Sequence, residues 1–239
     1  MSLKQFLFSL LILTSFINFA QQPVVIELFT SQGCSSCPPA DALLDEVSQE
    51  YGDDVIVLSY HVDYWDYIGW KDPFGSKLNT EKQYAFAKAY NLTSVYTPQA
   101  IINQQVHFTG SNEHHMKDAI IKHSDRKEKV NVVIDGATRK ENKVNLLVEF
   151  GSLPYNAQIT YAIAVREKAT EVKRGENRNK TLINTHIVAN FAQRKSAEAK
   201  KNLQLELPSW VSINDELDAI VYINVPREGI VGASRSRVQ

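Results

Sequence analysis

Cys34 and Cys37 are the only cysteines in the chain, and two thiols separated by two residues can carry out disulfide chemistry. They follow a short apolar run at residues 24–29 and precede a segment that opens with Pro38 and Pro39. A disulfide between them encloses too few residues to restrict the unfolded chain much, because the stabilisation grows with the length of the closed loop. A structural crosslink is therefore the weaker interpretation, and a reversible redox pair is favoured.

The helix predicted to begin at the two prolines would stabilise a thiolate on Cys34. Its first N–H groups have no partner within the helix, and the positive end of its dipole lies beside the cysteines, which lowers the pKa of a nearby thiol. Prolines are tolerated at this position because the N–H they lack would be unpaired anyway. We expect Cys34 to be the more exposed cysteine and the nucleophile, and Cys37, sheltered at the helix start, to resolve the mixed disulfide.

Glu27 is the third candidate catalytic residue. It lies on the strand that leads into the cysteines, and its neighbours on that strand are apolar. A carboxyl buried there would have a raised pKa and could relay a proton to or from Cys37 during exchange. The alternative is an acid at a strand edge that faces solvent. Because both faces of this strand are expected to be covered, the relay is favoured.

Residues 63–74 form a second unusual stretch, with five aromatic side chains and three acids. They follow the carboxyl end of the strand predicted at residues 55–62, the edge at which α/β sheets usually carry their sites. The aromatic rings could form a substrate wall or lid over the cysteines, or they could simply cap the edge of the sheet. Trp65, Asp66 and Trp70 are the candidate substrate contacts.

Two domains are expected, with a boundary in the charged segment at residues 124–129. Strands and helices alternate in residues 21–125, whereas residues 130–239 have β-branched, alternating segments and almost no helical periodicity. The fold class predicted is an α/β domain followed by a mainly antiparallel β-sandwich.

The elements expected to position the site can be assigned from periodicity and turn residues. The first domain is predicted to contain a strand at 24–29, a helix at 38–51, a strand at 55–62, a helix opened by a capping box at 80–83, a hairpin over 95–108 and a helix at 113–123. The second is predicted to contain strands at 130–134, 144–150, 159–165, 182–188, 203–207 and 217–225. The polar turn at residues 176–178 is interpreted as ordinary hairpin chemistry.

Residues 1–20 are interpreted as a signal peptide. Lys4 precedes an apolar run from Phe6 to Phe19, and Ala20 is a suitable cleavage position. The alternative is a membrane anchor, but the run is shorter than the roughly 20 apolar residues that span a bilayer. We therefore expect an exported protein, periplasmic or secreted, that has no contact with the membrane after the signal is removed.

The composition is that of an ordinary globular protein, with 44% hydrophobic and 22% charged residues. The formal net charge of −1 becomes −2 when Lys4 leaves with the signal peptide. Such a charge does not indicate nucleic acid or an acidic membrane as a partner. No cofactor and no resident metal are expected, and the expected partners are protein or small-molecule thiols and disulfides.

Three blocks, residues 27–41, 61–74 and 95–99, together resemble a secreted thioredoxin-like family of unknown function that is widespread in Gram-negative bacteria. The resemblance implies that the first domain has a thioredoxin-like fold, with Thr97 and Pro98 forming the pole of the site opposite the cysteines. It also implies that Pro98 is cis and that Thr97 presents backbone groups to the substrate. A cis bond also fits the sharp chain reversal required there, because X-Pro bonds adopt cis at little cost.

The favoured function is that of an exported thiol-disulfide oxidoreductase, and two alternatives remain. Cys34 and Cys37 could join His61 with His107 or the pair at residues 114–115 in a copper or zinc site, although none of the six histidines lies within a few residues of the cysteines. The other alternative is a non-enzymatic binding module whose β domain does the work and whose disulfide is a bystander.

Overall fold

A computed structural model gives the structure of the protein and describes residues 21–239. The predicted signal peptide at residues 1–20 lies outside the described residues. The elements follow in the order β1 (Val24–Thr30), α2 (Pro38–Tyr51), η1 (Gly52–Asp54), β2 (Val55–His61), η2 (Asp66–Ile68), α3 (Lys77–Ala89), β3 (Gln99–Ile102), β4 (Val106–Thr109), α4 (Glu113–Ser124), β5 (Val132–Lys140), β6 (Lys143–Phe150), β7 (Gln158–Glu171), β8 (Thr181–Lys195), η3 (Ser196–Glu198), β9 (Asn202–Glu206), β10 (Leu217–Val225) and β11 (Gly229–Arg237).

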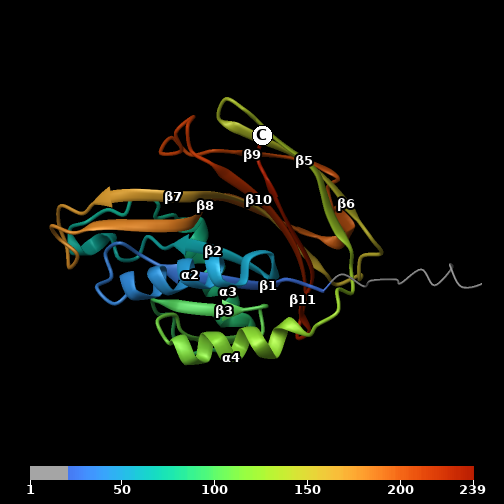
Figure 1. Cartoon of the computed structure of the whole chain (residues 1–239), viewed down its shortest axis with the longest axis horizontal. Helices are drawn as coiled ribbons and strands as arrows, with labels where there is room; N and C mark the ends of the chain where they lie inside the picture. The colour runs from blue at the N-terminus through green and yellow to red at the C-terminus, as the bar shows by residue number, and fades with distance from the viewer. Residues whose placement is uncertain (1–20) are drawn as a thin grey trace, which may run out of the picture.

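The protein is an α/β protein with one large mixed sheet, one small antiparallel sheet and few helices (Figure 1). The large sheet has eight strands in the order β11-β10-β7-β8-β2-β1-β3-β4, and the small sheet has the order β5-β6-β9. β1 pairs with β2 in parallel and with β3 antiparallel, and β2 meets β8 at Ser59 and Ile187. The large sheet therefore contains strands from both halves of the chain.

The helices cover the two faces of the sheet around β1, whose seven residues are all buried. Ile26 and Leu28 pack against Leu44 of α2 and Ile120 of α4, whereas Phe29 packs on the other side with Phe86 of α3. Alternate residues of a strand point to opposite faces, so β1 contributes to two separate cores. None of the helices in residues 21–239 is long and apolar enough to cross a membrane.

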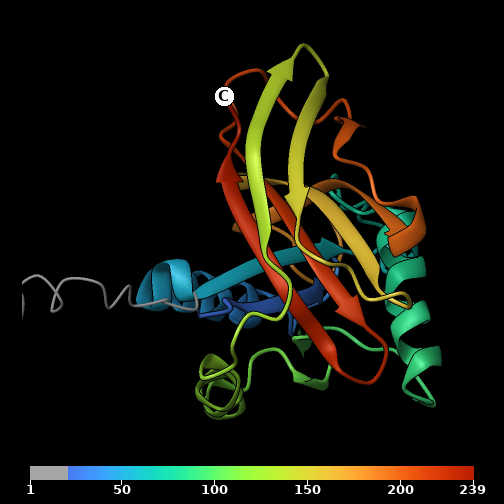
Figure 2. The ribbon, with the colours of Figure 1, turned by 90° about the vertical axis from the view of Figure 1, so that its right-hand side faces the viewer.

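The small sheet packs over the β7, β10 and β11 end of the large sheet, and Figure 2 shows β5 and β6 standing in front of β10 and β11. The core between these layers contains Leu146 and Val148 of β6 together with Tyr161, Ile163 and Val221 of the large sheet. Apolar side chains on facing sheets bury one another in this way in antiparallel two-layer folds. The strand-rich half is thus stabilised by its own apolar core.

The structure differs from the predicted elements at the start of one helix and in one additional strand. The helix predicted to open at residues 80–83 begins earlier, at Lys77, and its N-cap is Ser76, whose Oγ accepts a hydrogen bond from Leu78 N. Thr80 instead donates its hydroxyl to Asp63 Oδ1 over 2.6 Å, which ties α3 to the loop after β2. The final strand β11 was not predicted, because its Gly, Ser and Arg residues have low β-propensity.

Candidate functional site

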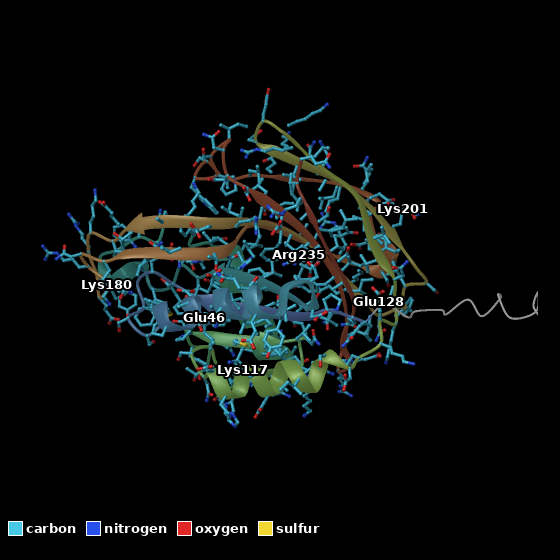
Figure 3. All side chains as sticks on the ribbon, viewed as in Figure 1. Glu46, Lys117, Glu128, Lys180, Lys201 and Arg235 are labelled. Atoms are coloured by element: carbon cyan, nitrogen blue, oxygen red, sulfur yellow. A yellow bond between two sulfur atoms is a disulfide. The ribbon has the colours of Figure 1, made fainter. Side chains whose placement is uncertain are left out.

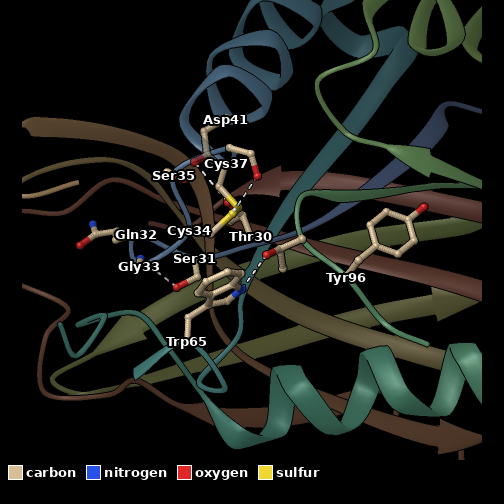
Figure 4. The surroundings of a disulfide bond; sticks show 12 residues. Thr30, Ser31, Gln32, Gly33, Cys34, Ser35, Cys37, Asp41, Trp65 and Tyr96 are labelled. Carbon is tan, nitrogen blue, oxygen red and sulfur yellow. Dashed lines mark hydrogen bonds between the residues drawn. A yellow bond between two sulfur atoms is a disulfide. The ribbon is translucent and has the colours of Figure 1, made fainter. Parts of the chain in front are cut away.

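The two cysteines lie between the end of β1 and the start of α2, and they form a disulfide with a Cα–Cα distance of 5.4 Å (Figure 4). Successive turns shape this loop, because Cys34 N donates to Ser31 O and Cys37 N donates to Cys34 O. Cys37 is the N-cap residue of α2, and the prolines occupy the first helical positions as predicted. The first turn of α2 thus begins directly at the disulfide.

Both cysteines are buried, so the predicted exposure of Cys34 is wrong. Cys34 is 1% exposed and Cys37 is fully buried, whereas Ser35 and Ser36 between them are exposed. Gly33 contributes to this burial, because a Cβ atom there would lie 3.1 Å from Cβ of Trp65. The loop after β2 packs closely on the cysteine loop and leaves little room for a bulkier residue at position 33.

The candidate substrate contacts lie on that loop and are joined to the cysteine loop or to one another. Trp65 Nε1 donates to Thr97 Oγ1 over 2.7 Å, and Figure 4 shows the indole beside the disulfide. Trp70 Nε1 donates to Gln32 Oε1 over 3.2 Å, and Asp66 Oδ1 accepts from Asp72 N within the loop. The structure therefore brings Trp65, Trp70 and Thr97 together at the cysteines, while Asp66 shapes the loop.

The peptide bond between Thr97 and Pro98 is cis, as predicted. Pro98 packs near α2, because a Cβ atom built on Gly110 would lie 3.2 Å from Ala40 Cβ and 3.3 Å from Pro98 Cβ. Ala40 belongs to the first turn of α2, the turn that Cys37 caps. Pro98 is therefore on the α2 side of the cysteine region, as the predicted substrate-docking role requires.

Gln32 connects the cysteine loop to three other segments and is 1% exposed. Its N–H donates to Asp72 Oδ2 and its side-chain Nε2 donates to Asn184 Oδ1, both over 2.8 Å. Its carbonyl accepts from Asn177 Nδ2 over 2.9 Å. Because Asn177 lies in the turn between β7 and β8 and Asn184 lies on β8, the strand-rich half of the chain holds the cysteine loop in place.

The tip of the β7–β8 hairpin has a larger role than the predicted simple turn. Asn177 is fully buried, and its Nδ2 also donates to Cys34 O over 3.0 Å. Glu176 Oε2 accepts from Ser35 N over 2.9 Å, and hydrogen bonds from the Ser35 side chain and backbone lower the pKa of Glu176. The interpretation of residues 176–178 as ordinary hairpin chemistry is therefore wrong.

Replacing Asn177 by alanine is expected to destabilise the protein by about 1–3 kcal/mol, because the Gln32 carbonyl would lose its donor in a buried position. Urea unfolding followed by circular dichroism measures this change. Arg178→Ala is the matched control, since Arg178 is exposed on the same turn. An Asn177→Ala variant no less stable than the control would show that the tip does not hold the cysteine loop.

A buried carboxyl that is not among the predicted site residues lies behind the disulfide. Asp41 follows Cys37 by four residues, which places the two on the same face of α2, and Asp41 N donates to Cys37 O over 3.1 Å. Burial raises the pKa of Asp41 to about 7, although nearby His61 and a hydrogen bond from Thr30 act in the opposite direction. Asp41 can therefore gain or lose a proton near neutral pH.

The Asp41 carboxyl belongs to a buried polar cluster. Its Oδ2 accepts from Asn184 Nδ2 over 3.4 Å, and within residues 21–239 its Oδ1 has no hydrogen-bond partner. His61 Nδ1 lies 2.7 Å from Asp72 Oδ2, with both side chains fully buried. Burial lowers the pKa of His61, but the carboxylates of Asp72 and Asp41 outweigh it and the net shift is upward. The cluster places two acids and an imidazole next to the cysteine loop.

Glu27 is fully buried, as predicted, but its contacts lie on the other face of the sheet. It alternates with Ile26 and Leu28, which pack against α2 and α4, so its side chain points toward α3. Its Oε1 lies 3.0 Å from Lys82 Nζ and accepts from the Tyr222 hydroxyl over 2.7 Å, and Gln104 donates to Oε2. These contacts give no support to the predicted relay to Cys37.

The histidines of the metal-binding alternative are spread over separate environments. His61 is bound to Asp72, His107 Nδ1 lies 3.1 Å from the Tyr96 hydroxyl, and His114 and His115 lie in the first turn of α4. Among residues 21–239, no group of three His, Cys, Asp or Glu side chains is arranged to hold a metal ion. The described part of the chain therefore gives this alternative no site.

Comparisons with known proteins show a family and a shared architecture. The model of a family described as a protein of unknown function, DUF1223, matches residues 25–224. A crystal structure of a protein from Agrobacterium tumefaciens is similar, with 32% identity and a TM-score of 0.65 over 90% of this chain and 95% of that chain. HBP35 of Porphyromonas gingivalis shares the fold, with 12% identity and a TM-score of 0.53 over 91% of this chain and 76% of that chain. None of the curated proteins matches the chain.

Proposed function

The chain belongs to the DUF1223 family, and we propose that it is a thiol-disulfide oxidoreductase with a thioredoxin-like active site. The observation that carries this proposal is the Cys34–Cys37 disulfide at the start of α2, with the ionisable Asp41 behind it and the Thr97–Pro98 segment beside it. The order strand, helix, strand, helix, hairpin, helix over β1 to α4 supports the thioredoxin-like assignment.

The reaction proceeds by two thiol-disulfide exchanges. In the reduced protein the Cys34 thiolate attacks one sulfur of a substrate disulfide, which forms a mixed disulfide and releases the other sulfur as a thiolate. The Cys37 thiolate then attacks Cys34 Sγ, re-forms the Cys34–Cys37 disulfide and releases the second substrate thiolate. The substrate gains two electrons and the protein loses two. Run in reverse, the same steps oxidise a substrate dithiol.

Asp41 is the proposed acceptor of the Cys37 proton in the second step. It lies one helical turn behind Cys37, its Oδ1 has no other partner within the described residues, and its pKa of about 7 matches the transfer to neutral conditions. When the reaction runs in reverse, protonated Asp41 returns the proton to Cys37 as that thiolate leaves. The nearby His61 and Asp72 pair acts on this carboxyl electrostatically, since His61 lowers the pKa of Asp41 and Asp72 raises it.

Substrate must displace part of the cover over the disulfide, because neither cysteine is exposed. The Trp65 indole joins the loop after β2 to Thr97 through a hydrogen bond over 2.7 Å, and Tyr64 on the same loop also hydrogen-bonds with Thr97. Breaking both hydrogen bonds would free Thr97, and a shift of the indole from its position beside the disulfide in Figure 4 would open that side to substrate. Tyr67, which stacks on Trp65 at 6.4 Å and is 82% exposed, would move with it.

The proposed location is the periplasm or the outside of the cell. The signal-like segment at residues 1–20 supports it, as does a dithiol motif that would cycle between oxidised and reduced states in an oxidising compartment. The proposed substrates are protein or small-molecule thiols and disulfides.

The burial of both cysteines favours a second candidate, a binding module whose disulfide is inert. The two functions differ in whether the folded protein carries out thiol-disulfide exchange with an added dithiol. Under the oxidoreductase proposal, the oxidised protein reacts with a dithiol at native conditions and a Cys34→Ser/Cys37→Ser variant does not. Exchange by the folded wild type supports the oxidoreductase, and its absence supports the binding module.

A further inference from the structure

Basic side chains gather at the outer tip of the β7–β8 hairpin. Between Val172 and Thr181 the chain has one acid, Glu176, and four basic residues, all of them exposed, namely Lys173, Arg174, Arg178 and Lys180. Figure 3 shows nitrogen-tipped side chains projecting from this end of the molecule, where Lys180 is labelled. Within residues 21–239 these four cations make no ion pair of their own with an acid. The tip therefore has positive charge that the described protein does not neutralise.

Hydrogen bonds fasten this tip to the cysteine loop, including the one from Asn177 Nδ2 to the Gln32 carbonyl. Glu176 accepts from Ser35 N and Asn177 donates to Cys34 O, while Lys180 Nζ donates to Asn177 Oδ1 over 3.0 Å. Gly175 packs on the aromatic loop, since a Cβ there would lie 3.1 Å from Trp70 Cβ. The four cations consequently stand at the rim of the disulfide site.

The acids near the rim leave the tip with an excess of positive charge. Glu176 keeps its negative charge while it accepts from Ser35 N, and exposed Glu171 ends β7 directly before the tip. On the loop after β2, Asp63 accepts from Thr80, and Asp72 is paired with buried His61. Asp66 on the same loop accepts from Asp72 N, and Lys71 adds a further exposed cation. Residues 171–181 hold four basic and two acidic side chains, a formal charge of +2, although the chain as a whole carries a net charge of −1.

We infer that this rim selects substrates in which acidic residues flank the reactive cysteine, and that the substrate is an acidic polypeptide segment. The inference rests on the proposed oxidoreductase function. The four cations lie in the turn between β7 and β8, two before Glu176 and two after Asn177. A polypeptide can present several carboxylates to all of them at once, and a single small thiol cannot. Exposed Tyr67 on the neighbouring loop offers an aromatic contact to the same chain.

The physical basis is electrostatic attraction between the rim and the substrate. Charges of opposite sign raise the encounter rate and fix the orientation in which two molecules meet. Salt weakens this attraction between exposed charges, with a screening length of about 10 Å at about 0.1 M. A preference for acidic substrates should therefore be large at low salt and small at high salt.

The test compares two peptides, each with one cysteine held in a mixed disulfide with the same chromophoric thiol. In one peptide glutamates flank the cysteine, and in the other lysines do. Reduced protein should release the chromophore about tenfold faster from the acidic peptide at low salt, and the ratio should approach one at about 0.5 M salt. A Lys173→Glu/Arg178→Glu variant should reverse the preference. The control is Lys200→Glu/Lys201→Glu, which changes the same charge at exposed positions far from the site, and it should keep the wild-type preference.

Equal rates for the two peptides in the wild type, or a preference that survives in the tip variant, would overturn the inference. A second comparison uses two small disulfides, oxidised glutathione, which carries carboxylates, and cystamine, which carries amines. If the reduced protein reacts faster with oxidised glutathione by the same factor as with the acidic peptide, the assignment of a polypeptide substrate is overturned. Binding of an acidic peptide with serine in place of cysteine, followed by fluorescence anisotropy, separates this inference from the proposed function. Binding that depends on the tip, without any thiol exchange, supports the peptide-binding role of the tip and contradicts the oxidoreductase function. An absence of binding contradicts the peptide-binding role of the tip.

Discussion

A Cys37→Ser variant expressed in the exported compartment will accumulate covalent adducts that reductant dissolves, whereas a Cys34→Ser variant will accumulate none. Removing Cys37 blocks only the second exchange, so each substrate that Cys34 attacks stays bound through a mixed disulfide. Removing Cys34 abolishes the first step. The Cys37→Ser variant therefore has covalent adducts and the Cys34→Ser variant has none, and non-reducing electrophoresis detects this difference.

The environment of the two sulfurs is the basis for this asymmetry, since exposure does not distinguish them. Cys34 lies in the turn before the helix, and its Sγ is 3.3 Å from the hydroxyl of exposed Ser36, which can stabilise a thiolate. Cys37 caps α2 and has Asp41 one turn behind it. The double variant Cys34→Ser/Cys37→Ser is the control for adducts through other groups. Equal adducts from both single variants would contradict the assignment of Cys34 as nucleophile.

An Asp41→Asn variant will lose stability less steeply than the wild type as the pH rises from about 4 to about 7. The folded wild type holds a proton on Asp41 up to a pKa of about 7, whereas the unfolded chain releases it near the ordinary aspartate pKa of 3.8. Between these values the folded state binds more protons, so its stability falls as the pH rises and levels off above the folded pKa. The free energy of unfolding that this one group removes over that pH range is roughly 4 kcal/mol, because each unit of the pKa difference corresponds to about 1.4 kcal/mol.

Urea unfolding at a series of pH values measures this effect, and His61→Asn separates it from the neighbouring imidazole, which faces both Asp41 and Asp72. In exchange assays, Asp41→Asn should also slow the Cys37 step at neutral pH and flatten its pH dependence near 7. Glu27→Gln is the matched comparison, and it should leave that pH profile unchanged. A profile altered by Glu27→Gln and not by Asp41→Asn would return the proton relay to Glu27.

Much of the first half of the chain could be predicted from its periodicity. The strand at residues 24–29, the helix beginning at Pro38 and the strand from Val55 follow from apolar patterns and turn residues that act over a few positions. The start of α3 was misplaced because Ser76 and Thr80 are both plausible caps, and only contact with Asp63 decides which one is used. Local sequence determines such elements well and their ends poorly.

The parts of the site that were missed depend on contacts between distant segments. Asn177 lies 143 residues after Cys34, and nothing in its local sequence indicates that it donates to the Cys34 carbonyl. The pairing of β2 with β8 brings these segments together, and long-range strand pairing leaves no local signal. A buried hydrogen bond of this kind becomes visible only in the folded chain.

The acid behind the disulfide could have been found from spacing. Asp41 follows Cys37 by four residues in a predicted helix, so the two share a face. Glu27 was favoured instead because its burial on a strand was correctly predicted, but alternation alone does not say which face of the sheet a residue occupies. Lys82 and Tyr222, which Glu27 contacts, come from segments whose position the sequence does not reveal.

The most direct measurement is a redox titration of the folded wild-type protein in glutathione buffers, with thiols counted by alkylation and tertiary structure followed by near-UV circular dichroism. We predict that the Cys34–Cys37 disulfide opens and re-forms reversibly while the tertiary signal persists, which yields a defined reduction potential. A disulfide that resists reduction until urea unfolds the chain would contradict the oxidoreductase and leave the buried pair as an inert crosslink.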